Sequence, residues 1–168
     1  MERLILHWGE MGARWGINRT VAQIHALLFF SERPLAAEEI AETLGVARSN
    51  VSNSLKELQA WGIVSVVHLL GDRRDHFQSL KDVWQMFAIV LDERKRREMD
   101  PTVKVLRETS AQLAESHPQP DSHTQERLKD LLDFFETMET WYQEVHRLPL
   151  KSRVQIVRLG ARLSELLR

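Results

Sequence analysis

The strongest constraint on the fold of this chain lies in residues 36–79, where two short helical patterns are followed at once by two strand-like segments. The first helical pattern carries Ile40 and Leu44 on one face, and the second repeats apolar residues at i, i+4 and i+7. Between them, Gly45 accepts the positive φ of a tight turn, and the small Ala41 lies where the two helices would cross. This order predicts a winged helix-turn-helix within a mainly α-helical chain.

The second helix of this motif has two different faces. Val51, Leu55 and Leu58 form an apolar stripe, whereas the opposite side is polar. Short polar groups and cations suit the base edges and phosphates of duplex DNA, which a recognition helix reads in the major groove. The predicted DNA-binding residues of this helix are Arg48, Ser49, Asn50, Ser52, Asn53 and Lys56. The alternative is an ordinary solvated helix surface, and the hairpin that follows favours DNA binding.

The hairpin begins after Trp61-Gly62, where a glycine can end the helix. Residues 63–69 are β-branched and apolar, residues 71–75 form a charged turn, and residues 76–79 return as a second strand, so we expect a two-stranded wing. Arg73 and Arg74 at its tip could reach a sugar-phosphate edge or a minor groove, with Asp72 and Asp75 holding their side chains in position. The alternative is a solvated charged turn.

The wing run Asp72-Arg73-Arg74 resembles the wing of the MarR superfamily. The stretch WGINRTVAQIHALLFFSERPLAAEEIAETLGVARSNVSNSLKELQAWGIV, followed by GDRRDHF and DVWQMF, is more similar to the GbsR/MarR-like branch of bacterial regulators, and the likeness covers about residues 1–115. The resemblance implies a homodimeric transcription factor on double-stranded DNA, often a repressor released by a small ligand. Some members of this branch are linked to choline or glycine betaine.

Outside the motif the chain has helical patterns over residues 2–15, 19–30 and 80–99, with a restart at Asp100-Pro101, and over two further segments that follow a linker at 117–121. We divide it into an N-terminal dimerisation helix (1–18), a winged-helix DNA-binding domain (19–80) and a helical dimerisation and possible effector region (81–168). A small winged domain cannot bury every apolar stripe. The stripes therefore favour a homodimer matched to a palindromic operator over packing within one chain. The terminal stripes include Leu4, Trp8, Met11, Leu132, Phe135, Val157 and Leu163.

Composition agrees with a globular DNA-binding protein. Apolar residues make up 43% of the 168 residues, which suffices for a core, and no uninterrupted apolar run is long enough to suggest a membrane span. The acidic residues within the first helix argue against a secretory signal, and the absence of cysteine excludes disulfides; both fit a cytoplasmic protein. The net charge is −1, so the positive charge that DNA requires must be local.

We expect no enzymatic activity, metal or cofactor. The seven histidines show no metal-ligand spacing, and the chain has neither a phosphate-binding glycine loop nor a GxSxG motif. Trp84, Phe87, Trp141 and Tyr142 are candidates for an effector site, because aromatic rings can enclose a quaternary ammonium group. Aromatic residues at helical spacing also occur in ordinary cores. The rival function is a winged-helix module that organises DNA or docks a protein partner without an inducer.

Overall fold

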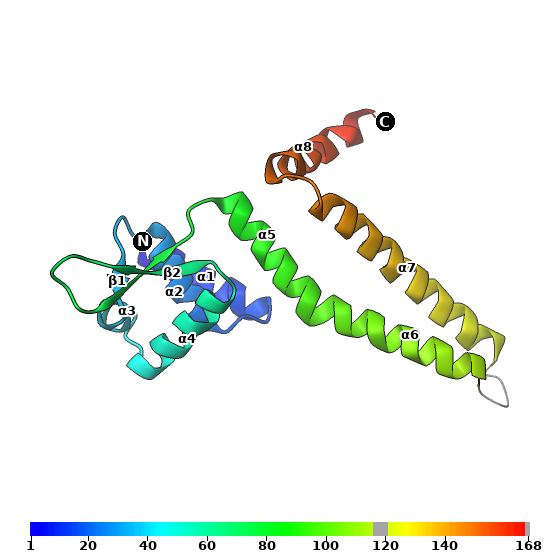
Figure 1. Cartoon of the computed structure of the whole chain (residues 1–168), viewed down its shortest axis with the longest axis horizontal. Coiled ribbons are helices and arrows are strands. Elements are labelled where there is room, and N and C mark those ends of the chain that lie inside the picture. The colour runs from blue at the N-terminus through cyan, green and yellow to red at the C-terminus, as the bar shows by residue number, and fades with distance from the viewer. Residues whose placement is uncertain (116–120, 167–168) are drawn as a thin grey trace. The chain divides into compact units, whose positions relative to one another are not determined.

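The computed structural model describes residues 1–115 and 121–166, with described side chains ending at residue 160 (Figure 1). The chain divides into two compact units, Met1–Val90 and Leu91–Arg168. The first unit carries the predicted winged helix-turn-helix, and the described elements of the second are all helices. The elements of the first unit are α1 (Glu2–Arg14), α2 (Arg19–Phe30), β1 (Leu35–Ala36), α3 (Ala37–Leu44), α4 (Arg48–Ala60), β2 (Val64–His68), β3 (Asp75–Ser79) and the first part of α5 (Val83–Arg94).

The sheet of the first unit has three antiparallel strands in the order β1-β3-β2. The two predicted wing strands are β2 and β3, which pair from Val64 with Ser79 to His68 with Asp75. The third strand could not be predicted, since β1 is only the dipeptide Leu35–Ala36, paired with Phe77 and His76. Because its two residues lie directly before α3, this short strand ties the start of the helix-turn-helix to the base of the wing.

The core of the first unit lies where α2, α3 and α4 meet the sheet. Its largest fully buried side chains are Ile24, Leu28, Ile40, Val51, Leu55 and Leu58. Ile5 of α1 joins the same cluster, and Met86 and Ile89 of α5 pack against it, so the compact unit takes in residues on both sides of the predicted 19–80 domain. Burial of aliphatic side chains at this density is the main stabilising contribution to a small domain.

Helix α1 lies close against α2 because it presents glycine to it. A Cβ built at Gly12 would come within 2.5 Å of the Ala22 Cβ, so the contact has no room for a larger side chain. Glycine costs helix stability in isolation, and the close helix contact offsets that cost. The tight packing explains why Ile5, Gly9 and Gly12 are the buried residues of α1, whereas Leu4, predicted on its apolar stripe, is exposed.

A predicted helix restart at Asp100-Pro101 is wrong. Helix α5 begins at Val83, where the Asp82 carboxylate accepts hydrogen bonds from two backbone N–H groups, and continues through a π-helical turn, η1 (Lys95–Met99), into α6 (Asp100–Glu115). A proline inside an α-helix removes a hydrogen bond and crowds the carbonyl four residues earlier. The helix nevertheless continues, and the π turn lies directly before Asp100 and Pro101.

The second unit contains α6, α7 (Ser122–His146) and α8 (Leu150–Leu166), with α6 and α7 side by side (Figure 1). Arg107 bridges these two helices through ion pairs of 3.1 Å to Glu136 and Glu139. Of the predicted linker, residues 117–120 lie outside the described residues, while Asp121 caps α7 by accepting a hydrogen bond of 2.9 Å from the Thr124 backbone N–H.

The second unit buries very little of itself. Among residues 91–115 and 121–160, Val103 is the one buried side chain. Apolar residues exposed along α6, α7 and α8 include Val105, Leu131, Phe134, Trp141, Ile156, Val157 and Leu159. Leu163, part of the predicted C-terminal stripe, lies outside the described side chains. In the described part of the chain, no helix combines the length and hydropathy that crossing a bilayer requires.

Candidate DNA-binding surface

The turn between α3 and α4 follows from one glycine. Gly45 has φ of +63°, the left-handed conformation that glycine adopts without strain, and its N–H bonds back to the Glu42 carbonyl. Ile40 and Ala41 of α3 are buried against Val51 and Leu55 of α4. The second helix is therefore fixed on the first by its apolar stripe, and the other side of α4 is left open.

All six predicted DNA-binding residues of α4 are exposed: Arg48, Ser49, Asn50, Ser52, Asn53 and Lys56. They lie across the helix from the buried side chains Val51, Leu55 and Leu58, as the periodicity predicted. Arg48 already has a partner, because its guanidinium donates to the Glu38 carboxylate of α3. Their contact with DNA stays a prediction.

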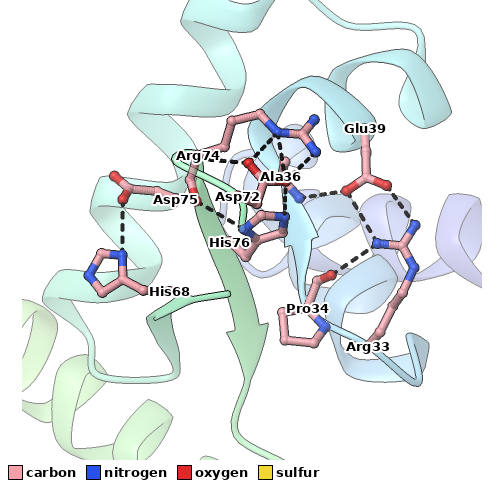
Figure 2. Close-up of polar contacts among 9 residues, drawn as sticks. All are labelled: Arg33, Pro34, Ala36, Glu39, His68, Asp72, Arg74, Asp75 and His76. Carbon is pink, nitrogen blue, oxygen red and sulfur yellow. Dashed lines mark hydrogen bonds and ion pairs between the residues drawn. The ribbon is translucent and has the colours of Figure 1, made fainter. Parts of the chain in front are cut away.

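The wing arginines have different surroundings. Arg74 is held by Asp72: its Nε lies 3.0 Å and its second guanidinium nitrogen 2.6 Å from the two carboxylate oxygens, and the Arg74 backbone N–H donates to the same group (Figure 2). These bonds hold the pKa of the Asp72 carboxyl well below its usual range. Arg73 is exposed at the tip. The hypothesis that Asp72 orients a wing arginine therefore agrees with the geometry.

The parallel hypothesis for Asp75 is wrong. Asp75 begins β3 and pairs across the ladder with His68 of β2, and its carboxylate lies 3.7 Å from the His68 Nδ1 rather than against an arginine (Figure 2). The reason is the register of the hairpin, because residues directly opposite on antiparallel strands bring their side chains together. Asp75 therefore belongs to the strand pair, and Asp72 alone reaches a wing arginine.

A buried histidine contacts both members of the Asp72–Arg74 pair. His76 is 2% exposed; its Nδ1 lies 3.0 Å from the Arg74 carbonyl oxygen and its Nε2 lies 3.5 Å from an Asp72 oxygen (Figure 2). Because a carbonyl oxygen can only accept, Nδ1 of His76 is the donor in this hydrogen bond. The sequence analysis counted this histidine among seven scattered ones, and strand alternation could not have identified it as buried, because His76 and its neighbour Phe77 lie on opposite faces of β3 and both are buried.

A second polar cluster surrounds Glu39 at the start of α3. Glu39 of α3 accepts from Arg33 at 2.6 Å and from the Ala36 backbone N–H at 2.8 Å, so it caps the start of its own helix (Figure 2). The hydrogen bond from Arg33 is the larger cause, and the Ala36 bond adds to it, in lowering the pKa of Glu39 to about 2. The Glu39 carboxylate also contributes to raising the pKa of Arg74, although Asp72 is the larger cause.

A sequence profile described as the MarR family matches residues 15–75, which span the helix-turn-helix and the turn of the wing. The chain is a MarR-like regulator. It is 23% identical over 136 residues to the HTH-type transcriptional repressor GbsR of Bacillus subtilis (strain 168), a match covering 80% of this chain and 75% of that protein. The putative HTH-type transcriptional regulator YvaV of the same strain is 19% identical over 127 residues, with coverage of 73% and 72%.

A solved structure, described as the crystal structure of a transcriptional regulator, has the fold of this MarR-like chain. It superposes with a TM-score of 0.65 at 20% sequence identity and covers 92% of this chain and 97% of that one. The likeness therefore reaches beyond the 15–75 match to the helices on both sides of the winged domain. At this identity the comparison concerns the fold alone.

The four predicted effector aromatics of this MarR-like chain are divided between the two units. Trp84 and Phe87 lie on α5 in the first unit, and only Phe87 of these two lines a cavity there. In the second unit, Trp141 is exposed, whereas the Tyr142 hydroxyl donates to Asp92 and its ring stacks on His146 at 5.6 Å between centroids. Trp141 and Tyr142 are thus neighbours in sequence with different surroundings.

One residue that connects the segment after the wing to α2 had no signal in the sequence. The Lys81 ammonium donates to the carbonyl oxygens of Leu28, Phe29 and Ser31 at 2.9, 2.6 and 2.8 Å, at the C-terminal end of α2. A cation at this position bonds orphan carbonyls and complements the helix dipole. Since Lys81 directly follows the wing and precedes α5, it fixes both to α2.

Proposed function

We propose that this MarR-like regulator is a homodimeric repressor that binds a palindromic operator through α4 and the wing and is released by a small ligand. The observation that carries the proposal is the polar face of α4, where six exposed side chains lie opposite a fully buried stripe. Such an arrangement leaves a helix free to enter a major groove while its other side stays anchored in the domain.

The wing supports the same interface. Asp72 pre-orients Arg74, and Arg73 stands exposed beside it, so both cations are available to phosphates or to a minor groove. Arg48 is paired with Glu38 in the free protein, and a phosphate oxygen would compete with that carboxylate for the guanidinium. These local cations reconcile DNA binding with a net charge of −1.

Homodimer formation is supported by the second unit. Its helices expose more apolar side chains than they bury, and a two-fold interface with a second copy would cover them. Two recognition helices related by such an axis would meet successive major-groove faces about 34–36 Å apart, which is the geometry of a palindrome. Repression and release by a ligand are supported by the similarity to a Bacillus subtilis repressor and by the family resemblance.

The recognition helix is tested by selecting DNA sites with the wild-type protein and with Asn50→Ala and Asn53→Ala. Each lost base contact should cost about 1–3 kcal/mol and relax specificity at one operator position. Gln85→Ala, at an exposed position on α5, is the matched control and should return the wild-type motif. Both asparagine variants returning that motif at wild-type affinity would remove α4 from the base-reading role.

The wing is tested by measuring the salt dependence of binding for Arg73→Ala and Arg74→Ala. If the arginines contact phosphates, each change should reduce the slope of log affinity against log salt by about one unit without altering the preferred sequence. A changed preference for flanking A·T pairs would instead indicate insertion in the minor groove. Unchanged binding at every salt concentration would exclude the wing from the interface.

The same measurements separate the repressor from the rival functions. An electrophoretic mobility shift of one palindromic duplex that persists in the presence of competitor DNA supports the regulator. Binding that ignores sequence supports a DNA-organising protein, and no binding to any duplex supports a module that docks a protein partner.

A further inference from the structure

The turn of the wing carries a leucine that no other residue covers. The Asp72 N–H donates to the Leu69 carbonyl oxygen at 3.1 Å and closes a four-residue turn, in which Gly71 has the third position with φ of +86°. A positive φ at that position is typical of a type II turn and favours glycine. Leu70 has the second position, at the outer corner of the hairpin, and its side chain is 107% exposed (Figure 1).

Local structure gives no reason for a leucine at this corner. The second position of such a turn favours proline and accepts most residues, and polar residues dominate turns in general. Leu70 adds nothing to the core of the first unit because none of its side chain is buried, and Leu69 beside it is also exposed. Since a single exposed leucine is common on protein surfaces, the argument depends on what surrounds this one.

The surroundings of Leu70 are cationic and held in place. Arg73 is exposed on the same turn, and the Arg74 side chain is 52% exposed while Asp72 holds its guanidinium (Figure 2). The corner therefore lies between the hydrogen bond that closes the turn and the Asp72–Arg74 pair. An apolar side chain flanked by arginines complements a groove that has phosphates along its edges and stacked bases at its floor. The partner that this pattern fits is duplex DNA.

We propose that Leu70 is a wedge that enters the minor groove beside each half-site, partly unstacks one base step and thereby determines specificity. The inference rests on the proposed DNA binding and adds a residue that reads the duplex through its deformability. Proteins that insert leucine between base steps kink the duplex by about 20–90°. Pyrimidine–purine steps, TA and CA/TG, are kinked most easily, so one of them should be preferred where the wing lies. The flanking arginines then contact the phosphates of the groove edges.

The test uses the full-length protein and the duplex that the wild type selects from a random library. 2-Aminopurine replaces the adenine of the pyrimidine–purine step at the wing, because its fluorescence rises when it unstacks. Wild-type protein at saturation should raise this fluorescence and bend the duplex, as measured by energy transfer between dyes at its two ends. Leu70→Ala should lose both changes and weaken binding about 5- to 20-fold, as expected for partial burial of a leucine side chain. Leu70→Met, which keeps a large apolar side chain, should retain both changes.

Arg73→Ala is the matched control on the same turn. It should reduce the slope of log affinity against log salt by about one unit and leave the rise in fluorescence intact at saturating protein. Leu70→Ala should do the reverse, keeping the slope and losing the rise. A second site selection with Leu70→Ala should keep the positions read by α4 and lose the preferred step at the wing. Because the Leu70 side chain is fully exposed, the circular dichroism of Leu70→Ala should match that of the wild type.

Several outcomes would overturn the wedge and leave the proposed repressor standing. These are a selected operator without a pyrimidine–purine step at the wing, no rise in fluorescence with the wild type, or an unchanged rise with Leu70→Ala. Weaker self-association of Leu70→Ala in sedimentation without DNA would also overturn it, because the leucine would then contact protein. Failure of the wild type to bind any duplex would overturn the wedge and the proposed function together, so the two failures are distinguishable.

Discussion

The two units of this regulator differ in how much of their apolar surface they bury. The first has a continuous core in which Ile24, Ile40 and Val51 are wholly buried, and polar clusters at its edges tie the sheet to the helices. In the second, Val103 is the single buried side chain among the described residues, and charged pairs such as Arg107 with Glu136 join exposed helices. Exposed ion pairs contribute little stability, so they cannot substitute for a core.

The difference indicates that the units have different requirements for folding. The first unit buries an apolar core within one chain, as a stable small domain requires. The second unit exposes many apolar side chains to solvent, which monomeric proteins rarely do over a large surface. The free energy of unfolding of the first unit should therefore be independent of protein concentration. That of the second unit should rise with protein concentration, because self-association stabilises it.

The largest expected effect comes from removing most of the second unit. Ending the chain after Glu115 deletes α7 and α8 and should convert a dimer to a monomer while the winged domain keeps its fold. Loss of the paired half-site contact should weaken operator binding about 10²- to 10⁴-fold. Sedimentation, circular dichroism and DNA binding of this truncation check the three statements. A truncated protein that stays dimeric and binds normally would assign the C-terminal helices to another task, such as partner docking.

A matched pair of core and surface substitutions sharpens the comparison. Leu55→Ala in the first unit removes a side chain that is 2% exposed and should lower the free energy of unfolding by about 2–5 kcal/mol. Phe134→Ala in the second unit removes one that is 57% exposed and should weaken self-association instead. Urea unfolding at several protein concentrations distinguishes the two. A concentration-independent loss of stability in Phe134→Ala would mean that this ring packs within its own chain.

The smallest expected effect is a pH dependence confined to the first unit. Because burial and Lys81 lower the pKa of His25 to about 4, the unfolded chain binds a proton between pH 6.5 and 4 that the folded chain does not. Stability from this residue is complete above pH 6.5 and falls as the pH drops, by at most about 1.4 kcal/mol per pH unit. The unfolding free energy of wild type minus that of His25→Leu, measured from pH 7 to 5, should show this slope. A flat difference would mean that His25 has the same pKa in the folded and unfolded states, and the opposite slope would mean that folding raises its pKa.

Much of the first unit was predictable because its signals are local. Helical periodicity identified the buried side of α4, and Gly45 identified the turn. The strand β1, the buried His76 and the Lys81 contacts were not predictable, because each depends on residues distant in sequence that only the fold brings together. Of the four aromatic residues predicted for an effector site, Phe87 lines the apolar cavity of the first unit, and their role in effector binding stays a prediction.

The π turn at Lys95–Met99 has a consequence for how surfaces are phased along the helix from Val83 to Glu115. A π turn takes up one residue more than an α turn, and each residue of an α-helix rotates the chain by about 100°. The faces of α5 and α6 are therefore out of step with a single α-helical repeat, so one uninterrupted heptad pattern cannot describe both. Apolar positions spaced for an α-helix before residue 95 therefore do not continue on the same stripe after residue 99.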